Sequence, residues 1–278
     1  MTYSESLGGL KVLITRPEKQ SETLASMVRD LGGDAFDFPL LKVDSIKDEL
    51  RISKLEEKLK KLSSYHKLIF VSKNAVTYGA EVISKNCPNL PTEVDVIAIG
   101  SSTAKVASEF FGCEVMHPMS GSVSEDLIAL PCLANVKQKR IAIFRGTGGR
   151  EFLAGSLIDR GAEVEYFEVY ERSPTERGGH ELLEIISEHD VNVLTITSGD
   201  SLRVLNKLFL ESGNGSFDLF SIPIIVPSAR VSLLAEELGF QKIKLAQGAD
   251  TRATVSALHE VASEADKSDY NQRGIDLR

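Results

Sequence analysis

The sequence lacks the segments that would place a protein in or across a membrane. No apolar run approaches the roughly 20 residues needed to span a bilayer. The first ten residues, MTYSESLGGL, contain no basic region followed by an apolar core, so they do not resemble a signal peptide. We therefore expect a cytoplasmic protein that makes no membrane contact.

Cysteine is scarce, and histidine shows no metal-ligand spacing. Cys87, Cys113 and Cys132 form no CxxC pair and are odd in number. We expect them to be small buried apolar side chains in a reducing compartment. The sequence predicts no metal site and no metal cofactor.

An excess of basic residues is also absent. The chain has 40 Asp and Glu against 32 Lys and Arg, a net charge of −8. Nucleic-acid binding calls for clustered Lys and Arg opposite the phosphates, so we expect no nucleic-acid partner. The net charge does not exclude a small anionic ligand, because a local site can be positive on a negatively charged protein.

Familiar catalytic motifs are missing as well. No GxSxG elbow appears, and no pair of carboxylates stands out. The segment 146–149, GTGG, follows an expected strand and opens an expected helix, as a phosphate loop does. It has neither GxGxxG spacing nor the Lys-Ser/Thr of a Walker A sequence. A nucleotide loop is therefore disfavoured, although its position keeps that interpretation open.

What the chain does contain is an internal repeat. Residues 11–43 align without a gap on residues 140–172, and Arg16 falls on Arg145 at an offset of 129. Later, Ser72 matches Ser198 at an offset of 126, and Ser101 matches Ser228 at 127. Such self-similarity predicts two copies of one β/α unit of about 130 residues.

Apolar strands alternate with helical patterns along both copies. Alternation of this kind predicts an α/β fold of parallel sheets covered by helices on both faces. Each copy has the size of a flavodoxin-like sheet. The expected strands are 11–15, 35–43, 67–71, 94–99, 114–116, 141–144, 191–197, 222–226 and 242–246. The expected helices include 47–62, 122–130, 150–160 and 251–263, and the polar tail 263–278 is predicted to be disordered.

The residues that follow the strands predict an anion site. Ligands of open parallel sheets bind beyond the carboxyl ends of the strands. Helix N-termini there present unpaired N–H groups and a partial positive charge, which suit carboxylates or phosphates. Each residue alone is more often an N-cap or a solvated charge, so the prediction depends on their accumulation. The candidates are Arg16, Ser72, Ser101, Ser102, Thr103, Arg145, Gly146, Ser198, Ser228 and Arg230.

Tyr170 is the one aromatic candidate. It lies in the segment FEVYER, and its counterpart in the first copy is Leu41, so the repeat does not require an aromatic residue there. One interpretation is a half-buried strand tyrosine. The other is a phenol that donates a proton or a hydrogen bond to a leaving oxygen.

Several of these motifs together resemble one family. The segments ITRP, IFVSKNAV, AIGSSTAK, FRGTGGREFLA, EVYER, TSGDSL and VPSARVSLLAEELGF are similar to those of uroporphyrinogen-III synthases, in order, over roughly residues 10–260. One departure is the segment 227–230, PSAR, where many members have Gly and a Thr-Ala pair. The details of anion binding are therefore not carried over from the family to this loop.

The resemblance implies an architecture that repeat counting does not. It implies two flavodoxin-like lobes joined by a two-stranded linker, with the active site in the cleft between them. The duplication would be domain-swapped, so that each copy leaves its first β-α unit in the other copy's sheet. Lobe one would comprise residues 1–38 with 173–262, lobe two 39–172, and the linkers FPLLKV and EVYERS.

The resemblance also implies an activity. The family cyclises hydroxymethylbilane, a polycarboxylate, with inversion of ring D and loss of water, to uroporphyrinogen III for tetrapyrrole and heme biosynthesis. No cofactor is used. Tyr170 corresponds to the tyrosine that assists loss of the hydroxyl, and the serine and threonine candidates match loops that line the cleft. We expect a monomer whose contact with the preceding pathway enzyme is at most transient.

Two other functions compete with this one. A non-catalytic two-lobed binding protein for a small polyanion would also have paired α/β lobes. A nucleotide-dependent regulator is a third alternative, weakened by the missing motifs.

Overall fold

The chain divides into two compact units. The computed structural model describes residues 6–86, 93–121, 123–149, 151–213 and 218–275. Unit 1 comprises Met1–Lys42 with Ser173–Arg278, and unit 2 comprises Val43–Arg172. The first boundary lies at Lys42–Val43 instead of after Phe38, the position suggested by the sequence.

Unit 1 is built on a five-stranded sheet with the order β11-β10-β9-β1-β2, in which every described pair is parallel. Numbered along the unit, the strands run 2-1-3-4-5, which is the flavodoxin order. Their bounds are β1 Lys11–Ile14, β2 Asp34–Asp37, β9 Val193–Thr195, β10 Ile224–Val226 and β11 Ile243–Leu245.

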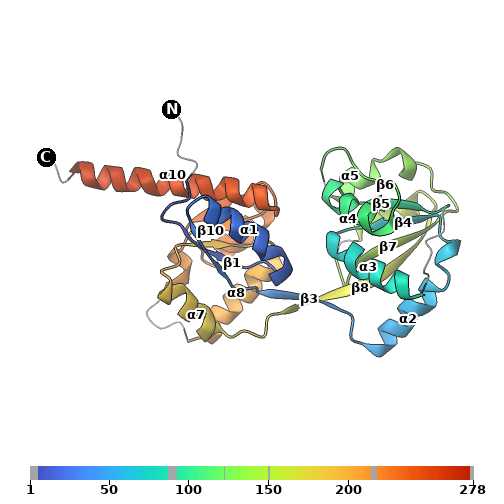
Figure 1. Cartoon of the computed structure of the whole chain (residues 1–278), viewed down its shortest axis with the longest axis horizontal. Helices are drawn as coiled ribbons and strands as arrows, with labels where there is room; N and C mark the ends of the chain where they lie inside the picture. The colour runs from blue at the N-terminus through green and yellow to red at the C-terminus, as the bar shows by residue number, and fades with distance from the viewer. Residues whose placement is uncertain (1–5, 87–92, 122, 150, 214–217, 276–278) are drawn as a thin grey trace. The chain divides into compact units, whose positions relative to one another are not determined.

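Helices cover both faces of this sheet (Figure 1). Leu13 and Leu194 point to one face and pack with α7, α8 and α9, whereas Val12 and Ile14 point to the other and pack with α1 and α10. Burial on both faces explains why these strands are apolar without period-2 alternation. The helices are α1 Glu18–Asp30, α7 Gly179–Glu188, α8 Gly199–Glu211, α9 Ala229–Glu237 and α10 Thr251–Ile275.

Unit 2 is built on a six-stranded sheet with the order β3-β8-β7-β4-β5-β6. If β7 is counted first and β3 is set aside, this order is again 2-1-3-4-5. The division between the units falls inside β3 and β8, since these neighbouring strands continue past it. The bounds are β3 Leu41–Ser45, β4 Lys67–Phe70, β5 Asp95–Ala98, β6 Val115–Met116, β7 Arg140–Gly146 and β8 Glu163–Pro174.

The second sheet is likewise covered on both faces. Phe70 and Phe144 pack with α2, α3 and α4 on one face, and Ile69 and Ile143 pack with α5 and α6 on the other. The α/β class with parallel sheets is therefore confirmed. The helices are α2 Glu49–Leu59, α3 Lys73–Asn86, α4 Ser101–Phe111, α5 Ser124–Ile128 and α6 Phe152–Asp159. Short 3₁₀ turns cover Leu62–Ser64, Pro131–Leu133 and Leu219–Ser221.

Glycine ends α1. Gly32 has φ of +84°, and its N–H donates to the carbonyl of Arg29 at 2.9 Å. The N–H of Gly33 then donates to the carbonyl of Val28 at 3.0 Å. These bonds satisfy carbonyls that the end of the helix leaves open.

Several expected boundaries shift. The expected strand 35–43 is two strands, β2 and β3, because the chain leaves one sheet before entering the other. The expected helix 47–62 is α2 followed by a 3₁₀ turn. Residues 122 and 150, where two helices were expected to start, lie outside the described residues.

The C-terminal helix is longer than predicted. We expected it to end at residue 263 before a disordered tail, but α10 continues to Ile275. Glu260 and Glu264 pair with Lys244 at 3.0 and 2.7 Å, which ties α10 to β11. Residues 276–278 lie outside the described part of the chain.

The cysteines are less buried than predicted. Cys113 and Cys132 are half-buried at the margins of the two apolar clusters of unit 2. Burial nevertheless raises the pKa of both thiols. Cys87 lies outside the described residues.

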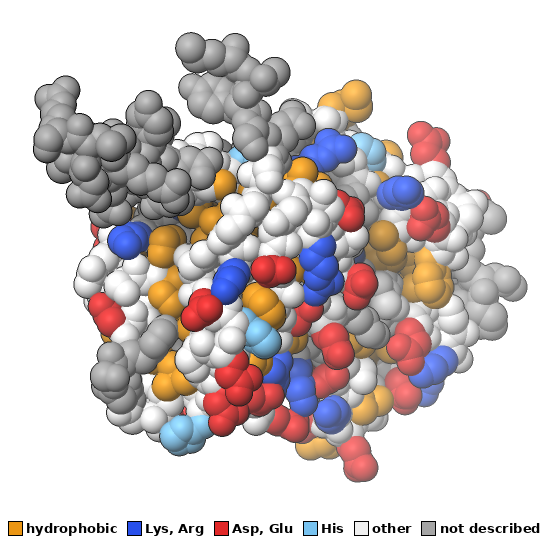
Figure 2. All heavy atoms as spheres, turned by 60° about the vertical axis from the view of Figure 1, so that its left-hand side comes forward, with side chains coloured by type: hydrophobic (Ala, Val, Ile, Leu, Met, Phe, Trp, Pro, Cys, Tyr) orange, Lys and Arg blue, Asp and Glu red, His pale blue; other side chains and the backbone are white. Residues whose placement is uncertain are grey.

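No helix in the described part of the chain combines the length and hydropathy needed to cross a bilayer. On the face that Figure 2 shows, acidic and basic side chains are intermingled and form no continuous basic patch. That face therefore lacks the clustered positive charge that nucleic acid calls for.

Candidate active site

Each sheet has one point at which the strand order reverses. It lies between β1 and β9 in unit 1 and between β7 and β4 in unit 2. Ligands of open α/β sheets bind at the carboxyl ends of the strands at such a point. In unit 2 these ends carry Ser72, Arg145 and Gly146, and in unit 1 they carry Arg16 and Ser198.

Tyr170 of β8 lies beside Gly146, at the carboxyl end of β7 in unit 2. Its side chain is buried, with 3% of the residue exposed. The phenol oxygen lies 3.1 Å from the Oγ of Ser72 and accepts from Nη2 of Arg172 at 3.4 Å. The ring of Tyr78 stacks on it with centroids 5.8 Å apart. The ring is thus held by packing, and its oxygen contacts a hydroxyl and a guanidinium, two groups that can fix its orientation by hydrogen bonding.

A β-bulge turns Tyr170 toward this position. Arg145 is paired with Glu168, and the next residue, Gly146, is paired with Tyr170, so Val169 is skipped. In a regular strand Val169 and Tyr170 would face opposite sides. Here both belong to one apolar cluster. Bulges of this kind re-aim side chains next to active sites.

Gly146 makes room for the phenol ring. A Cβ on Gly146 would lie 2.6 Å from the Tyr170 ring, closer than side-chain atoms can approach. The glycine that the sequence placed at a loop edge therefore has a packing role, because only hydrogen fits there.

Ser72 both caps a helix and touches the phenol. Its Oγ accepts from the backbone N–H of Ala75 at 3.0 Å at the start of α3, and it shares a hydrogen bond with Tyr170. The N-cap interpretation and the site interpretation are therefore compatible for this residue. The N-terminal end of α3 also favours an anionic group bound nearby.

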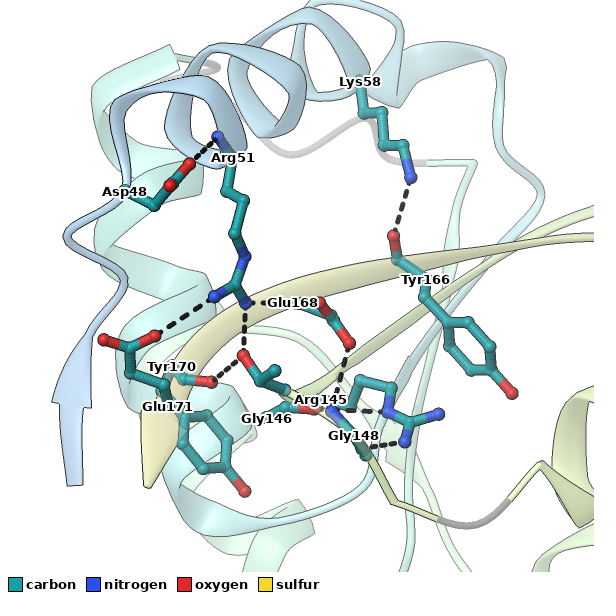
Figure 3. Close-up of polar contacts among 11 residues, drawn as sticks. Asp48, Arg51, Lys58, Arg145, Gly146, Gly148, Tyr166, Glu168, Tyr170 and Glu171 are labelled. Carbon is teal, nitrogen blue, oxygen red and sulfur yellow. Dashed lines mark hydrogen bonds and ion pairs between the residues drawn. The ribbon is translucent and has the colours of Figure 1, made fainter. Parts of the chain in front are cut away.

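The GTGG loop is filled by the protein's own side chains (Figure 3). Arg145, only 5% exposed, donates to the carbonyls of Gly146 and Gly148 and pairs with Glu151 at 3.3 Å. The N–H of Gly148 donates to Glu168 at 3.2 Å. A phosphate cradle needs free amides, so the nucleotide interpretation loses its structural support. Arg145 organises this loop instead of projecting as an exposed anion binder.

Arg16 of unit 1, like Arg145 of unit 2, is buried and donates to the protein's own oxygens. It is 6% exposed, and its guanidinium donates to Thr251 Oγ1 and Thr254 Oγ1 at 2.9 Å and to the Ala249 carbonyl at 3.0 Å. Among the described residues its Nε has no partner. Burial lowers the pKa of Arg16, against the opposing effect of Asp250. The side chain therefore fixes the loop that leads into α10.

The remaining unit 1 candidates differ in their accessibility. Ser198 caps α8, with its Oγ accepting from the N–H of Ser201 at 3.2 Å. Ser228 stands at the start of α9 without a side-chain cap bond, and Arg230 follows in the first turn. Both Ser228 and Arg230 are exposed. These two residues are free to meet a ligand.

The candidates at the start of α4 also differ in their accessibility. Ser101 and Ser102 are exposed in the first turn, whereas Thr103 is only 4% exposed. The N-cap residue is Gly100, which offers no side-chain oxygen. Ser101 and Ser102 can therefore reach a ligand, and Thr103 packs inward.

Sequence reasoning missed the side chains that support Tyr170. Arg51, Thr147 and Glu168 form hydrogen bonds around the bulge. Thr147 and Glu168 lie in the segments GTGG and EVYER but were not singled out, and Arg51 lies outside the quoted motifs. Arg172, in the EVYER segment, was not singled out either. The only signal was that Arg51 lies on an amphipathic helix preceding the site. In the described residues no group of three His, Cys, Asp or Glu side chains could hold a metal ion.

Sequence comparisons identify relatives over most of the chain. The family model described as uroporphyrinogen-III synthase HemD matches residues 22–256. The uroporphyrinogen-III synthase of Escherichia coli (strain K12) is 33% identical over 249 residues, covering 90% of this chain and 100% of that protein. The Salmonella typhimurium enzyme of the same name is 34% identical with the same coverage.

Solved structures show the same fold. A mutant uroporphyrinogen III synthase from Thermus thermophilus superposes with a TM-score of 0.56 and 14% identity, covering 92% of this chain and 100% of that one. The uroporphyrinogen-III synthetase of Helicobacter pylori gives 0.57 and 15%, covering 92% and 99%. The match over residues 22–256 and the identity to the Escherichia coli and Salmonella typhimurium enzymes show that the chain belongs to the uroporphyrinogen-III synthase family.

Proposed function

We propose that the protein is a uroporphyrinogen-III synthase, a cofactor-independent cyclising lyase. It converts hydroxymethylbilane to uroporphyrinogen III with inversion of ring D and loss of water. The observation that carries this proposal is the family match over residues 22–256, supported by relatives of that name aligned over their full length. The alternative of a non-catalytic binding protein receives no support from these relatives.

Tyr170 is our candidate catalytic residue. Loss of the ring A hydroxyl needs a proton at the leaving oxygen and produces an azafulvene. A phenol whose oxygen contacts Ser72 at 3.1 Å and Arg172 at 3.4 Å is placed to donate that proton, which leaves as part of water. Ring D then attacks through its substituted carbon, and the spiro intermediate reopens and closes inverted. The proton released when the macrocycle finally closes restores the phenol.

We propose that carboxylates of the substrate bind at the helix N-termini of both sheet edges. The exposed residues Ser101, Ser102, Ser228 and Arg230 suit direct contacts, and the capping residues Ser72 and Ser198 lie at the same edges. Thr103, Arg16, Arg145 and Gly146 act by holding the loops. Cyclisation requires the two ends of a flexible chain to meet, so fixing several carboxylates supplies much of the catalysis.

We also propose that the two units are flavodoxin-like lobes of a domain-swapped duplication joined by β3 and β8. Each sheet has the order 2-1-3-4-5 only when β1 and β2 are grouped with β9–β11, and β7 and β8 with β4–β6. Each borrowed pair matches the other in the repeat at an offset of 129. Lobe one is then 1–42 with 173 onward. The cytoplasmic location and the monomeric state stay predictions.

The deciding experiment supplies purified protein with hydroxymethylbilane and separates the product isomers. We expect the type III isomer. Formation of only the type I isomer, the spontaneous product, would reject the enzyme. Binding of uroporphyrinogen without any cyclisation would instead favour the binding protein, and a rate that depends on added nucleotide would favour a regulator.

A second experiment tests the role of Tyr170. Tyr170→Phe removes only the hydroxyl, and general acid catalysis contributes roughly 100-fold or more. We expect kcat to fall by about that factor with an unchanged melting temperature. Tyr78→Phe is the control, because its hydroxyl donates to the Val43 carbonyl at 2.7 Å, away from the phenol oxygen of Tyr170. Wild-type turnover by Tyr170→Phe would remove this residue from the mechanism.

A further inference from the structure

Arg51 of α2 binds the chain on both sides of Tyr170 (Figure 3). Its Nη1 lies 3.1 Å from Oε2 of Glu171, and its Nη2 lies 3.3 Å from Oε2 of Glu168. The same Nη2 donates to the hydroxyl of Thr147. One guanidinium therefore connects the helix to β8 and to the loop that follows β7.

Thr147, which accepts from Arg51, also donates hydrogen bonds to the backbone of Tyr170. Its N–H donates to the Tyr170 carbonyl at 2.8 Å, and its Oγ1 donates to the same oxygen at 3.4 Å. Glu168 adds a second connection, because its other oxygen accepts from the N–H of Gly148 at 3.2 Å. Arg51 is thus one hydrogen-bonded residue away from the peptide that bears the phenol.

The bulge explains why such support is needed. Skipping Val169 interrupts the regular ladder between β7 and β8 at the residue that Tyr170 follows, and a bulged segment depends on other contacts to hold one conformation. Glu168 and Glu171 also place two like charges beside it, about a third exposed. Without a cation between them these carboxylates would repel each other and pull the bulge apart.

Arg51 is itself fixed in place. Its backbone N–H donates to Oδ1 of Asp48 at the cap of α2, at 2.8 Å. The helix is anchored to the core by Leu55 and Leu59, which are 8% and 1% exposed. A planar guanidinium with donors in a rigid fork can meet three acceptors at once, whereas an ammonium cannot hold the same geometry.

We infer that Arg51 is a positioning residue for the reaction of the synthase. It fixes the bulge so that the Tyr170 phenol meets Ser72, and it acts through the backbone of Tyr170. The inference rests on the proposed function, since it assigns Arg51 a part in the chemistry of Tyr170.

The first test compares Arg51→Ala with a control on the same helix. Lys54 lines the same cavity of about 240 Å³ as Arg51, Tyr166 and Glu168, and among the described residues no hydrogen bond or ion pair of its side chain is found. We expect Arg51→Ala to lower kcat by roughly tenfold or more, since a misplacement of about 1 Å can cost roughly 100-fold. KM and the melting temperature should change little, and Lys54→Ala should match wild type. Equal kcat in the two variants would overturn the inference.

The second test is a double-mutant cycle. If Arg51 acts by placing the phenol, Arg51→Ala should have almost no further effect on kcat in a Tyr170→Phe background. Arg51→Lys should recover part of the activity, because the lysine charge can still reduce the repulsion between the carboxylates of Glu168 and Glu171. Full additivity of Arg51→Ala and Tyr170→Phe, or wild-type turnover by Tyr170→Phe, would show that Arg51 does not act through Tyr170.

The third test does not depend on activity. Hydrogen exchange at the amides of Thr147 and Gly148 reports the bonds that hold the bulge. Exchange should accelerate at both amides in Arg51→Ala and stay at the wild-type rate in Lys54→Ala. Unchanged protection would overturn the positioning role even where kcat falls. If wild-type protein forms only the type I isomer, the proposed function fails, while the exchange rates still decide whether Arg51 holds the bulge.

Discussion

The two sheet edges share an internal sequence repeat and use the matching residues differently. Arg16 and Arg145 match in the repeat, and both are almost completely buried. Arg16 binds Thr251, a residue 235 positions away, whereas Arg145 binds its own loop through Gly148. The equivalent arginine therefore secures a distant helix in unit 1 and a neighbouring turn in unit 2.

The chain segments that follow the paired strands differ more between the two units than the two arginines do. In unit 1, β1 and β2 stay in regular register up to Ile14 and Asp37. In unit 2 the equivalent strands keep the same register through Ile143 and Tyr166 but continue further, and the bulge that presents Tyr170 lies in that continuation. The position equivalent to Tyr170 is Leu41, which is buried. The comparison is consistent with our proposal that unit 2 supplies the reacting group and unit 1 contributes binding contacts.

The largest expected effect is at Gly146. Gly146→Ala places a Cβ 2.6 Å from the Tyr170 ring and forces the ring to move. We expect kcat to fall roughly 100-fold, since a reacting group displaced by about 1 Å loses its alignment. The measurement is steady-state formation of the type III isomer.

The control is Gly155→Ala in α6, where an added Cβ meets no atom within 4 Å. It should leave kcat unchanged and stabilise the helix by up to about 1 kcal/mol. Normal turnover by Gly146→Ala would mean that the phenol need not hold the observed position.

Removing the two buried arginines should separate their structural roles. Arg16→Ala removes the donor to two threonine hydroxyls and one carbonyl, and we expect a loss of about 2–4 kcal/mol in the free energy of unfolding. Arg145→Ala should cost less, because its partners belong to a local loop that can relax toward solvent. Urea unfolding of both variants checks the order, and a larger loss in Arg145→Ala would contradict it.

A smaller effect is expected from the exposed anion contacts of unit 1. Arg230→Gln removes one charge at the start of α9, and a charge-assisted bond is worth about 1.5–3 kcal/mol before solvent screening. We expect KM to rise by roughly tenfold or less with kcat nearly unchanged. Arg203→Gln on α8, paired with Asp200 at 3.5 Å, is the matched control. A fall in kcat alone would place Arg230 in the chemistry instead.

The smallest effect concerns alkaline stability and again distinguishes the units. Burial, followed by the hydrogen bond to Glu151, raises the pKa of Tyr166 to about 12, and burial also raises the pKa of Tyr65. A raised phenol pKa contributes stability that is present below the unfolded value of about 10 and is lost as pH rises toward the folded value. Both residues belong to unit 2.

Hydrogen exchange followed between pH about 9 and 11 should therefore show unit 2 losing protection before unit 1. Tyr166→Phe should weaken this dependence, since the variant has no phenol to titrate there. Simultaneous loss in both units would indicate that these tyrosines do not govern the alkaline limit.

Much of the site was predictable in position and less so in role. Ser72 was expected at the sheet edge and Tyr170 in the extended linker segment, and the structure brings their oxygens to 3.1 Å. Arg16 and Arg145 were expected to meet an anion, yet their donors are directed to the protein's own oxygens. The sequence shows a charge after a strand, but the direction of that side chain depends on which loop packs over it.

The sequence by itself determined the alternation of strands and helices, the repeat, and the membership of a family. Those features depend on local apolar periodicity and on motifs read in order. Only the tertiary structure decided the bulge at Val169, the packing of Gly146 against Tyr170, and the bridge from Arg51 to Glu168 and Glu171. These contacts join residues as many as 120 positions apart, and their geometry follows from strand register and helix packing, which no local pattern encodes.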